Sequence, residues 1–265
     1  MRLDQLLHQR GLFPSRERAK RAVMAGDVEV DGRIVDKPGT EVAEKALVEV
    51  RARMPYVSRA GVKLAGALDH FGLSPGDWVC MDVGASTGGF TDCLLQRGAR
   101  RVYAIDVGYG QLDYRLRNDE RVVVMERVNA RFLPADALPE KVRLVTVDVS
   151  FISLTKVVPA LLPHLLPGGY LLPLIKPQFE AGPEAVGKGG IVRDEEVRQR
   201  VVERRIDELA TLGLAVLGWT DAALAGTGGN LEVVALFAKP GVGESEAAPE
   251  SAVRGGSRTD ILPTE

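Results

Sequence analysis

Four charged residues lie where the sequence predicts the ends of apolar strands or a helix beside them. Asp148 ends the run Leu-Val-Thr-Val-Asp, Lys176 ends Leu-Leu-Pro-Leu-Ile-Lys, and Glu232 opens Leu-Glu-Val-Val-Ala-Leu-Phe. Lys63 lies on an amphipathic helix expected over residues 61–71. Parallel strands end at one edge of a sheet, and a final antiparallel strand starts at that edge, so three of the charges converge there. Two lysines and two carboxylates sum to zero charge, as a partly buried site requires.

Paired lysines and carboxylates suit the removal of a proton from a weakly acidic hydroxyl. A second ammonium group makes a lysine proton easier to lose, while neighbouring carboxylates orient the lysine and oppose that effect. The pattern therefore predicts a lysine general base at this edge. Taken singly, each residue is more readily explained as a surface lysine or a strand-end carboxylate in a salt bridge, but their shared position favours the chemical interpretation.

A glycine-rich turn follows the strand expected at residues 78–83 and leads directly into a helix. Such a turn brings bare backbone and helix N-terminal amides up to a ligand. Asp106 ends the next strand, where a carboxylate can accept hydrogen bonds from both ribose hydroxyls. Serine at position 86 departs from the dinucleotide fingerprint and disfavours a nicotinamide cofactor. A tight turn without a ligand stays open as the alternative. The residues expected to bind a nucleoside cofactor are Asp82, Gly84, Ala85, Ser86, Thr87, Gly88, Gly89 and Asp106.

Strand and helix signals alternate through residues 59–240. This alternation predicts a parallel sheet covered on both faces, a doubly wound, Rossmann-like α/β fold. About ten residues separate the last two strands, enough for a hairpin and too few for a helical crossover, so the final strand is expected to run antiparallel. Strands are expected at 78–83, 101–107, 144–149, 170–175, 214–220 and 231–238, and helices at 61–71, 89–96, 154–166 and 195–212.

A small basic α+β module is expected in residues 1–50. Leucines at helical spacing predict a helix that ends at Gly11, Ser15 is the expected N-cap of a second helix, and Val28 to Val35 predicts a hairpin. Residues 1–21 hold six basic and two acidic groups, a net charge of +4. This local charge contrasts with the whole chain, which has 34 Lys and Arg against 36 Asp and Glu.

Two segments are predicted to lie outside the folded domains. Residues 51–58 break the pattern and are expected to form a linker between the two domains. Residues 241–265 hold five acidic groups and two arginines among Gly, Ser, Ala and Pro, a net charge of −3. That tail is expected to be disordered, because it cannot bury enough apolar surface to offset chain entropy.

Several classes of protein are excluded by what the sequence lacks. Cys80 and Cys93 are too few for a disulfide framework or a four-cysteine zinc site, and the three histidines have no metal-ligand spacing. No signal peptide precedes the first predicted helix. The most apolar segment, 161–175, is interrupted by prolines and is shorter than the roughly 20 residues that a membrane-spanning helix needs. We expect a cytoplasmic protein without a metal and without membrane contact.

The motifs at these positions resemble known families. Residues 2–42, with Arg-Leu-Asp at the start, Ser-Arg-Glu at 15–17 and Gly-Asp-Val at 26–28, resemble the RNA-binding domain first described in ribosomal protein S4. Residues 56–239 are similar to an FtsJ-like methyltransferase domain. In this order the two domains resemble the TlyA family of ribosomal RNA cytidine 2′-O-methyltransferases, once named haemolysins. The motifs of the second domain are Tyr56 to Leu64, Asp82 to Asp92, Asp148 to Leu154, Lys176 to Glu180 and Gly229 to Glu232.

The resemblance implies a catalytic Lys-Asp-Lys-Glu tetrad at Lys63, Asp148, Lys176 and Glu232, the residues reached above from the sheet edge. It also implies S-adenosylmethionine at the glycine-rich turn. Lys176 is then the expected base, and Lys63 is expected to stabilise the developing alkoxide or to lower the basicity of its neighbour. The two carboxylates are expected to orient the lysines.

The expected partner is ribosomal RNA, held by its phosphates on the basic module through Arg2, Arg16, Lys20 and Arg21. Large-subunit RNA is the expected substrate and small-subunit RNA a second candidate. Family members that act on both subunits carry a short basic extension before the first helix, whereas this sequence starts almost directly at that helix. A non-catalytic RNA-binding assembly factor with a relic cofactor fold is the alternative. Pore formation has no support in the sequence, which favours no particular oligomeric state.

Overall fold

Two structural units share the chain in the computed structural model, Met1–Pro55 and Tyr56–Glu265. The structure describes residues 1–24, 26–50, 54–182, 185–187 and 189–241. The boundary falls inside the segment expected as a linker, whose residues 51–53 lie outside the described residues. Apart from its first residue, the predicted tail also lies outside them. Each unit is described by itself.

The first unit packs two helices against a small antiparallel sheet. Helices α1 (Leu3–Gln9) and α2 (Arg16–Met24) pack together with strands β1 (Val28–Val30), β2 (Arg33–Ile34) and β3 (Val48–Val50) around one small apolar core. The strand order is β2-β1-β3. The β1–β2 hairpin is the predicted one. Strand β3 was not predicted, because no tight turn joins it to a neighbouring run in the way that Asp31 and Gly32 join β1 and β2.

The predicted N-cap of the second helix is present. The Ser15 Oγ accepts a hydrogen bond from the backbone N–H of Arg18 at 3.3 Å, and this satisfies one of the free amides in the first turn of α2. The basic side chains of α2 therefore project from a helix whose first turn is fixed.

Seven strands form the central sheet of the second unit, in the order β6-β5-β4-β7-β8-β10-β9. Neighbours from β6 to β8 run parallel, β10 runs antiparallel to β8, and β9 runs antiparallel to β10. This confirms the doubly wound α/β sheet with an antiparallel last strand. The strands span Val79–Val83 (β4), Arg101–Asp106 (β5), Val122–Glu126 (β6), Val142–Val147 (β7), Leu165–Ile175 (β8), Ala215–Asp221 (β9) and Val233–Ala238 (β10).

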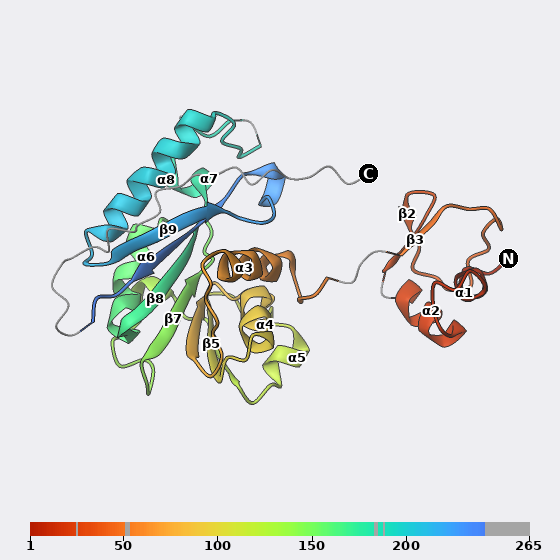
Figure 1. Cartoon of the computed structure of the whole chain (residues 1–265), viewed down its shortest axis with the longest axis horizontal. Coiled ribbons are helices and arrows are strands. Elements are labelled where there is room, and N and C mark those ends of the chain that lie inside the picture. The colour runs from red at the N-terminus through yellow and green to blue at the C-terminus, as the bar shows by residue number, and fades with distance from the viewer. Residues whose placement is uncertain (25, 51–53, 183–184, 188, 242–265) are drawn as a thin grey trace. The chain divides into compact units, whose positions relative to one another are not determined.

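Helices cover both faces of this sheet, as Figure 1 shows. Helices α3 (Arg59–His70) and α4 (Gly89–Gln96) bury one apolar cluster against one face, and α6 (Leu154–Leu161) and α8 (Glu195–Ala210) bury another against the opposite face. Strands β4, β5, β7 and β8 therefore end at one edge, where β10 begins. Short helical turns are α5 (Tyr114–Arg117), α7 (Pro177–Glu180), η1 (Ala130–Phe132), η2 (Leu162–His164) and η4 (Thr227–Gly229).

The largest differences from the predicted elements in this unit concern β6 and the segment from α6 to β8. Strand β6 was not predicted, although it pairs with β5 at the edge of the sheet. Helix α6 ends at Leu161 instead of Leu166, since the chain tightens into the proline-containing turn η2 before it enters β8. Strand β8 consequently begins five residues earlier than expected.

Candidate active site

The turn between β4 and α4 has a backbone that only particular residues can adopt. Gly84 has a φ of +84° and Gly88 a φ of +97°, in the left-handed region that favours glycine. A Cβ on Gly84 would overlap the carbonyl oxygen of Asp148 and lie 2.9 Å from its carbonyl carbon. The missing side chain therefore lets the end of β4 pack directly against the segment that follows β7.

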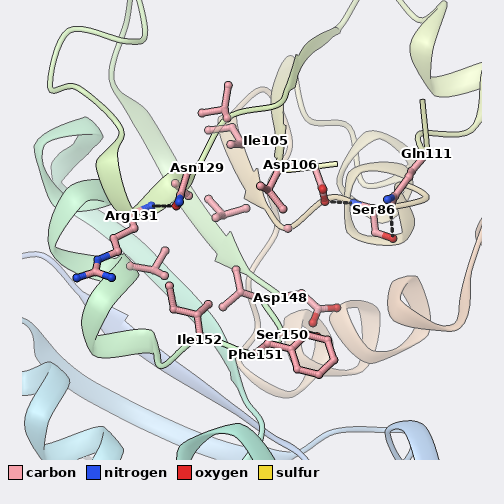
Figure 2. Close-up of a pocket in the computed structure, with 17 residues that line it drawn as sticks. Ser86, Ile105, Asp106, Gln111, Asn129, Arg131, Asp148, Ser150, Phe151 and Ile152 are labelled. Carbon is pink, nitrogen blue, oxygen red and sulfur yellow. Dashed lines mark hydrogen bonds between the residues drawn. The ribbon is translucent and has the colours of Figure 1, made fainter. Parts of the chain in front are cut away.

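A cavity of about 540 Å³ opens beside this turn. Figure 2 shows it between Ser86 and Asp106 on one side and Asp148, Ser150 and Phe151 on another. The Asp106 carboxylate accepts hydrogen bonds from the backbone N–H groups of Ser86 (2.7 Å) and Gly108 (2.6 Å). Each carboxylate oxygen has a second lone pair, so Asp106 retains acceptor capacity for ribose hydroxyls. The volume and these groups fit a nucleoside cofactor.

Five of the predicted cofactor residues do not line this cavity. Asp82 is fully buried, accepts a hydrogen bond from Thr91 Oγ1 at 2.7 Å, and lies 3.4 Å from Thr146 Oγ1. Burial raises the pKa of Asp82 to about 7. Asp82 therefore holds the strand and helix around the turn together from beneath. The other predicted residues off the lining are Ala85, Thr87, Gly88 and Gly89, whereas Gly84, Ser86 and Asp106 do line it.

Gly89 is required by helix packing. A Cβ at this first residue of α4 would lie 2.9 Å from Ala60 Cβ and from the backbone nitrogen of Gly61. The two helices therefore approach each other closely at this point, which holds α3 against the turn. Since Lys63 lies on α3, the same contact sets the position of a predicted catalytic side chain.

Lys176 and Asp148 form an ion pair at the wall of the cavity. Their Nζ and Oδ1 atoms lie 2.6 Å apart, and Lys176 Nζ also donates a hydrogen bond to Ser150 Oγ at 3.0 Å. The side chains are 12% and 18% exposed. Asp148 and Ser150 both line the cavity, so the lysine is held by two residues of its wall.

Lys63 and Glu232 form a second, more enclosed pair. Lys63 Nζ lies 2.5 Å from Glu232 Oε2, and the side chains are 11% and 3% exposed. Gln178 Nε2 lies 3.4 Å from the other carboxylate oxygen. A Cβ on Gly226 would overlap the Glu232 carboxylate, so the carboxylate is packed against bare backbone on that side.

The two ion pairs lie on neighbouring strands. Val233 of β10 is the register partner of Ile175 of β8. Glu232 and Lys176 directly adjoin these partners, so they lie opposite each other where the two strands meet the sheet edge. The structure thus brings together all four residues that were predicted from strand ends and the preceding helix.

Sequence reasoning missed three other residues of this edge. Ser150 and Gln178 each contact a member of an ion pair. Phe151 is 90% exposed, has a φ of +64°, and lies with its ring centroid 4.8 Å from that of Phe179. All three lie in the motifs given above for the second domain, but the spacing of apolar residues does not reveal a phenylalanine that faces solvent.

The predicted RNA-binding residues of the first unit fall into two groups. Arg2 Nε and Arg16 Nε each lie about 3 Å from a different oxygen of the buried Asp4 carboxylate, at 3.0 and 2.9 Å. The hydrogen bonds from Arg2 hold the pKa of Asp4 below its usual value. Lys20 and Arg21 are exposed on α2.

The described residues show neither a candidate metal cluster nor a helix that could span a membrane. Among those residues, no cluster of three or more histidine, cysteine or acidic side chains could hold a metal ion. None of the helices formed by them has the length and apolar character needed to cross a membrane.

Fold and site together define an α/β protein that holds a nucleoside cofactor beside paired charges at the carboxyl edge of its sheet. The family model for FtsJ-like methyltransferases matches residues 56–239, and that for the S4 domain matches residues 1–48. The chain therefore belongs to the FtsJ-like methyltransferase family and carries an S4 domain at its N-terminal end.

Named relatives extend over most of the chain. The Bacillus subtilis protein YqxC is 47% identical and covers 95% of this chain and 91% of its own length. The 16S/23S rRNA (cytidine-2′-O)-methyltransferase TlyA of Mycobacterium tuberculosis is 46% identical over 87% of each chain. A solved structure of a Streptococcus thermophilus protein named as a hemolysin is 43% identical, with a TM-score of 0.71 over 91% of this chain and 88% of that one.

Proposed function

We propose that the protein transfers a methyl group from S-adenosylmethionine to the 2′-hydroxyl of a cytidine in ribosomal RNA in the cytoplasm. The observation that carries this proposal is the set of two lysine–carboxylate pairs at one sheet edge, one of which has its carboxylate on the wall of a nucleoside-sized cavity. The identity with the TlyA methyltransferase supports the choice of a cytidine in ribosomal RNA. The S4 domain supports RNA as the partner.

The residues of the cavity fit the cofactor in distinct ways. Asp106 would accept hydrogen bonds from its ribose, and the bare backbone at Gly84 allows close approach. The bound cofactor supplies an activated methyl group on a sulfonium centre. Asp148 and Ser150 lie on the cavity wall and contact Lys176, so the proton-accepting group is held beside the space that the methyl donor would occupy.

Lys176 is the proposed base. Its uncharged amine would take the proton from the 2′-hydroxyl while the oxygen–methyl bond forms and the sulfur–methyl bond breaks. Asp148, 2.6 Å away, holds the lysine and stabilises the ammonium that results. Positioning contributes most here, because the reacting oxygen has to approach the methyl group in line.

Lys63 is the proposed fixed positive charge. Its pair with Glu232 is the more enclosed of the two, because the Glu232 side chain is 3% exposed and that of Asp148 is 18% exposed. A charge held in this position stabilises an oxygen that becomes negative as its proton leaves. Glu232 and Gln178 hold that charge in place.

The experiment is methyl transfer to isolated large and small ribosomal subunits, with mass mapping of methylated riboses. We expect methylated cytidine with the wild type and with Lys156→Ala, a control at an exposed lysine of α6. Lys176→Ala is expected to abolish transfer and to leave RNA affinity within a few-fold. Substantial turnover by this variant contradicts the assignment of the base. Tight RNA binding without transfer by the wild type would favour a non-catalytic assembly factor.

A further inference from the structure

A buried carboxylate lies under two of the arginines expected to bind RNA. Asp4 occupies the first turn of α1, and its side chain is 3% exposed. Its Oδ1 accepts from Arg2 Nε at 3.0 Å, and its Oδ2 accepts from Arg2 Nη2 at 3.2 Å and from Arg16 Nε at 2.9 Å. One carboxylate therefore holds two arginines that are 14 residues apart in the sequence.

The geometry leaves the outer donors of both arginines available. A guanidinium has five N–H donors in a fixed fork. Among the described residues, Arg2 uses its Nε and one Nη on Asp4, and Arg16 uses its Nε alone, so both Nη groups of Arg16 remain. The two side chains are 45% and 48% exposed. Each arginine thus has one edge fixed on Asp4, and the side chain that carries the remaining donors is about half exposed.

We propose that Asp4 is a positioning residue of the RNA-binding unit, which fixes Arg2 and Arg16 so that their outer N–H groups are preorganised for RNA phosphates. Long arginine side chains lose rotamer freedom when they bind a phosphate, and a carboxylate that already fixes them removes part of that loss. This inference rests on the proposed RNA contacts of the first unit. Its partner class is the phosphate backbone of RNA.

The inference and a simple charge count predict opposite effects of one substitution. Asp4→Asn removes a negative charge from a basic surface, so electrostatics alone predicts tighter binding to a polyanion. Loss of positioning predicts weaker binding. Glu17→Gln removes the same charge from the exposed first turn of α2 and is the matched control.

The test measures binding of the full chain to deproteinised large-subunit ribosomal RNA at low salt, well below the melting temperature of each variant. We expect Asp4→Asn to weaken binding about fivefold and Glu17→Gln to strengthen it about twofold. Tighter binding by both variants overturns the inference.

A double-mutant cycle separates positioning from a structural role of Asp4, which also accepts a hydrogen bond from the Gln5 backbone N–H. If Asp4 acts through the arginines, its substitution has little further effect once Arg2 and Arg16 are alanine. An unchanged fivefold loss in that background overturns the inference. No loss on replacing the two arginines themselves would instead refute their proposed RNA contacts.

A second variant covers the case in which Asp4→Asn does not fold. Arg16→Lys keeps the positive charge but cannot hold Asp4 through one nitrogen while presenting two others. We expect it to weaken RNA binding several-fold, whereas Arg18→Lys, at an exposed neighbour on α2, leaves binding unchanged. Equal affinities of the two lysine variants overturn the inference.

Discussion

Replacement of Gly84 by alanine tests whether close backbone approach builds both the cofactor cavity and the catalytic edge. The new Cβ would overlap the carbonyl oxygen of Asp148, which is backbone and cannot rotate away as a side chain can. It would also occupy a φ of +84°. The substitution therefore either pushes the β7 end outward or forces the turn out of its left-handed conformation.

The expected magnitude has two parts. A left-handed conformation costs an alanine about 1–2 kcal/mol, and overpacking of a well-filled contact adds about 1–3 kcal/mol. Gly213→Ala supplies the control, since its φ is +81° and a Cβ there meets no atom within 4 Å. The difference between the two variants isolates the contact with Asp148.

The assays are urea unfolding and calorimetric titration with S-adenosylmethionine. Gly84→Ala is expected to lose about 1–3 kcal/mol more unfolding free energy than Gly213→Ala and to bind the cofactor more weakly. Turnover is expected to fall further, on the order of 100-fold for a displacement of about 1 Å, because Asp148 carries Lys176 with it. Equal stabilities of the two variants together with unchanged cofactor affinity would refute the reasoning.

Three further perturbations test other parts of the argument. Because the pKa of Asp82 is raised to about 7, the folded wild type binds an extra proton between about pH 4 and 7. Its unfolding free energy therefore falls by at most about 4 kcal/mol as the pH rises through that window. In Asp82→Asn, unfolding free energies measured at pH 5 and pH 8 should not show this fall. Replacing Lys20 and Arg21 by alanine should reduce the log-log salt slope of RNA binding by about 0.7–0.9 per lost phosphate contact, and an unchanged slope places the RNA contacts elsewhere. Lys63→Met should destabilise the fold by about 3–5 kcal/mol, because it leaves Glu232 buried without its cation. Adding Glu232→Leu should restore stability, measured by denaturation, but should not restore methyl transfer, measured by turnover.

The sheet and its reactive edge were predictable because strand ends in a parallel sheet have a fixed geometric meaning. Asp148 and Lys176 directly follow strands that run the same way, and Glu232 directly precedes one that runs the opposite way. Which lysine pairs with which carboxylate was not predictable. That pairing depends on how helix α3 packs, and hence on the close contact at Gly89, which joins segments far apart in sequence.

Asp82 was predicted to bind the cofactor but does not line the cavity, for a reason that lies in strand geometry. A carboxylate two residues before a glycine turn looks close to a ligand in sequence, but Asp82 is still inside β4 and its side chain enters the layer beneath the turn. Successive side chains alternate between the faces of a strand, and sequence alone does not say which face adjoins the cavity. Asp106, at the very end of its strand, avoids this ambiguity.

The different burial of the two ion pairs indicates a division of tasks. A group that accepts and releases a proton in each turnover needs contact with substrate and solvent, while a group that supplies a constant charge works better when water is excluded. Asp148 is 18% exposed on the cavity wall, whereas Glu232 is 3% exposed and packed against Gly226. The more open pair therefore suits proton transfer and the closed pair suits electrostatic stabilisation.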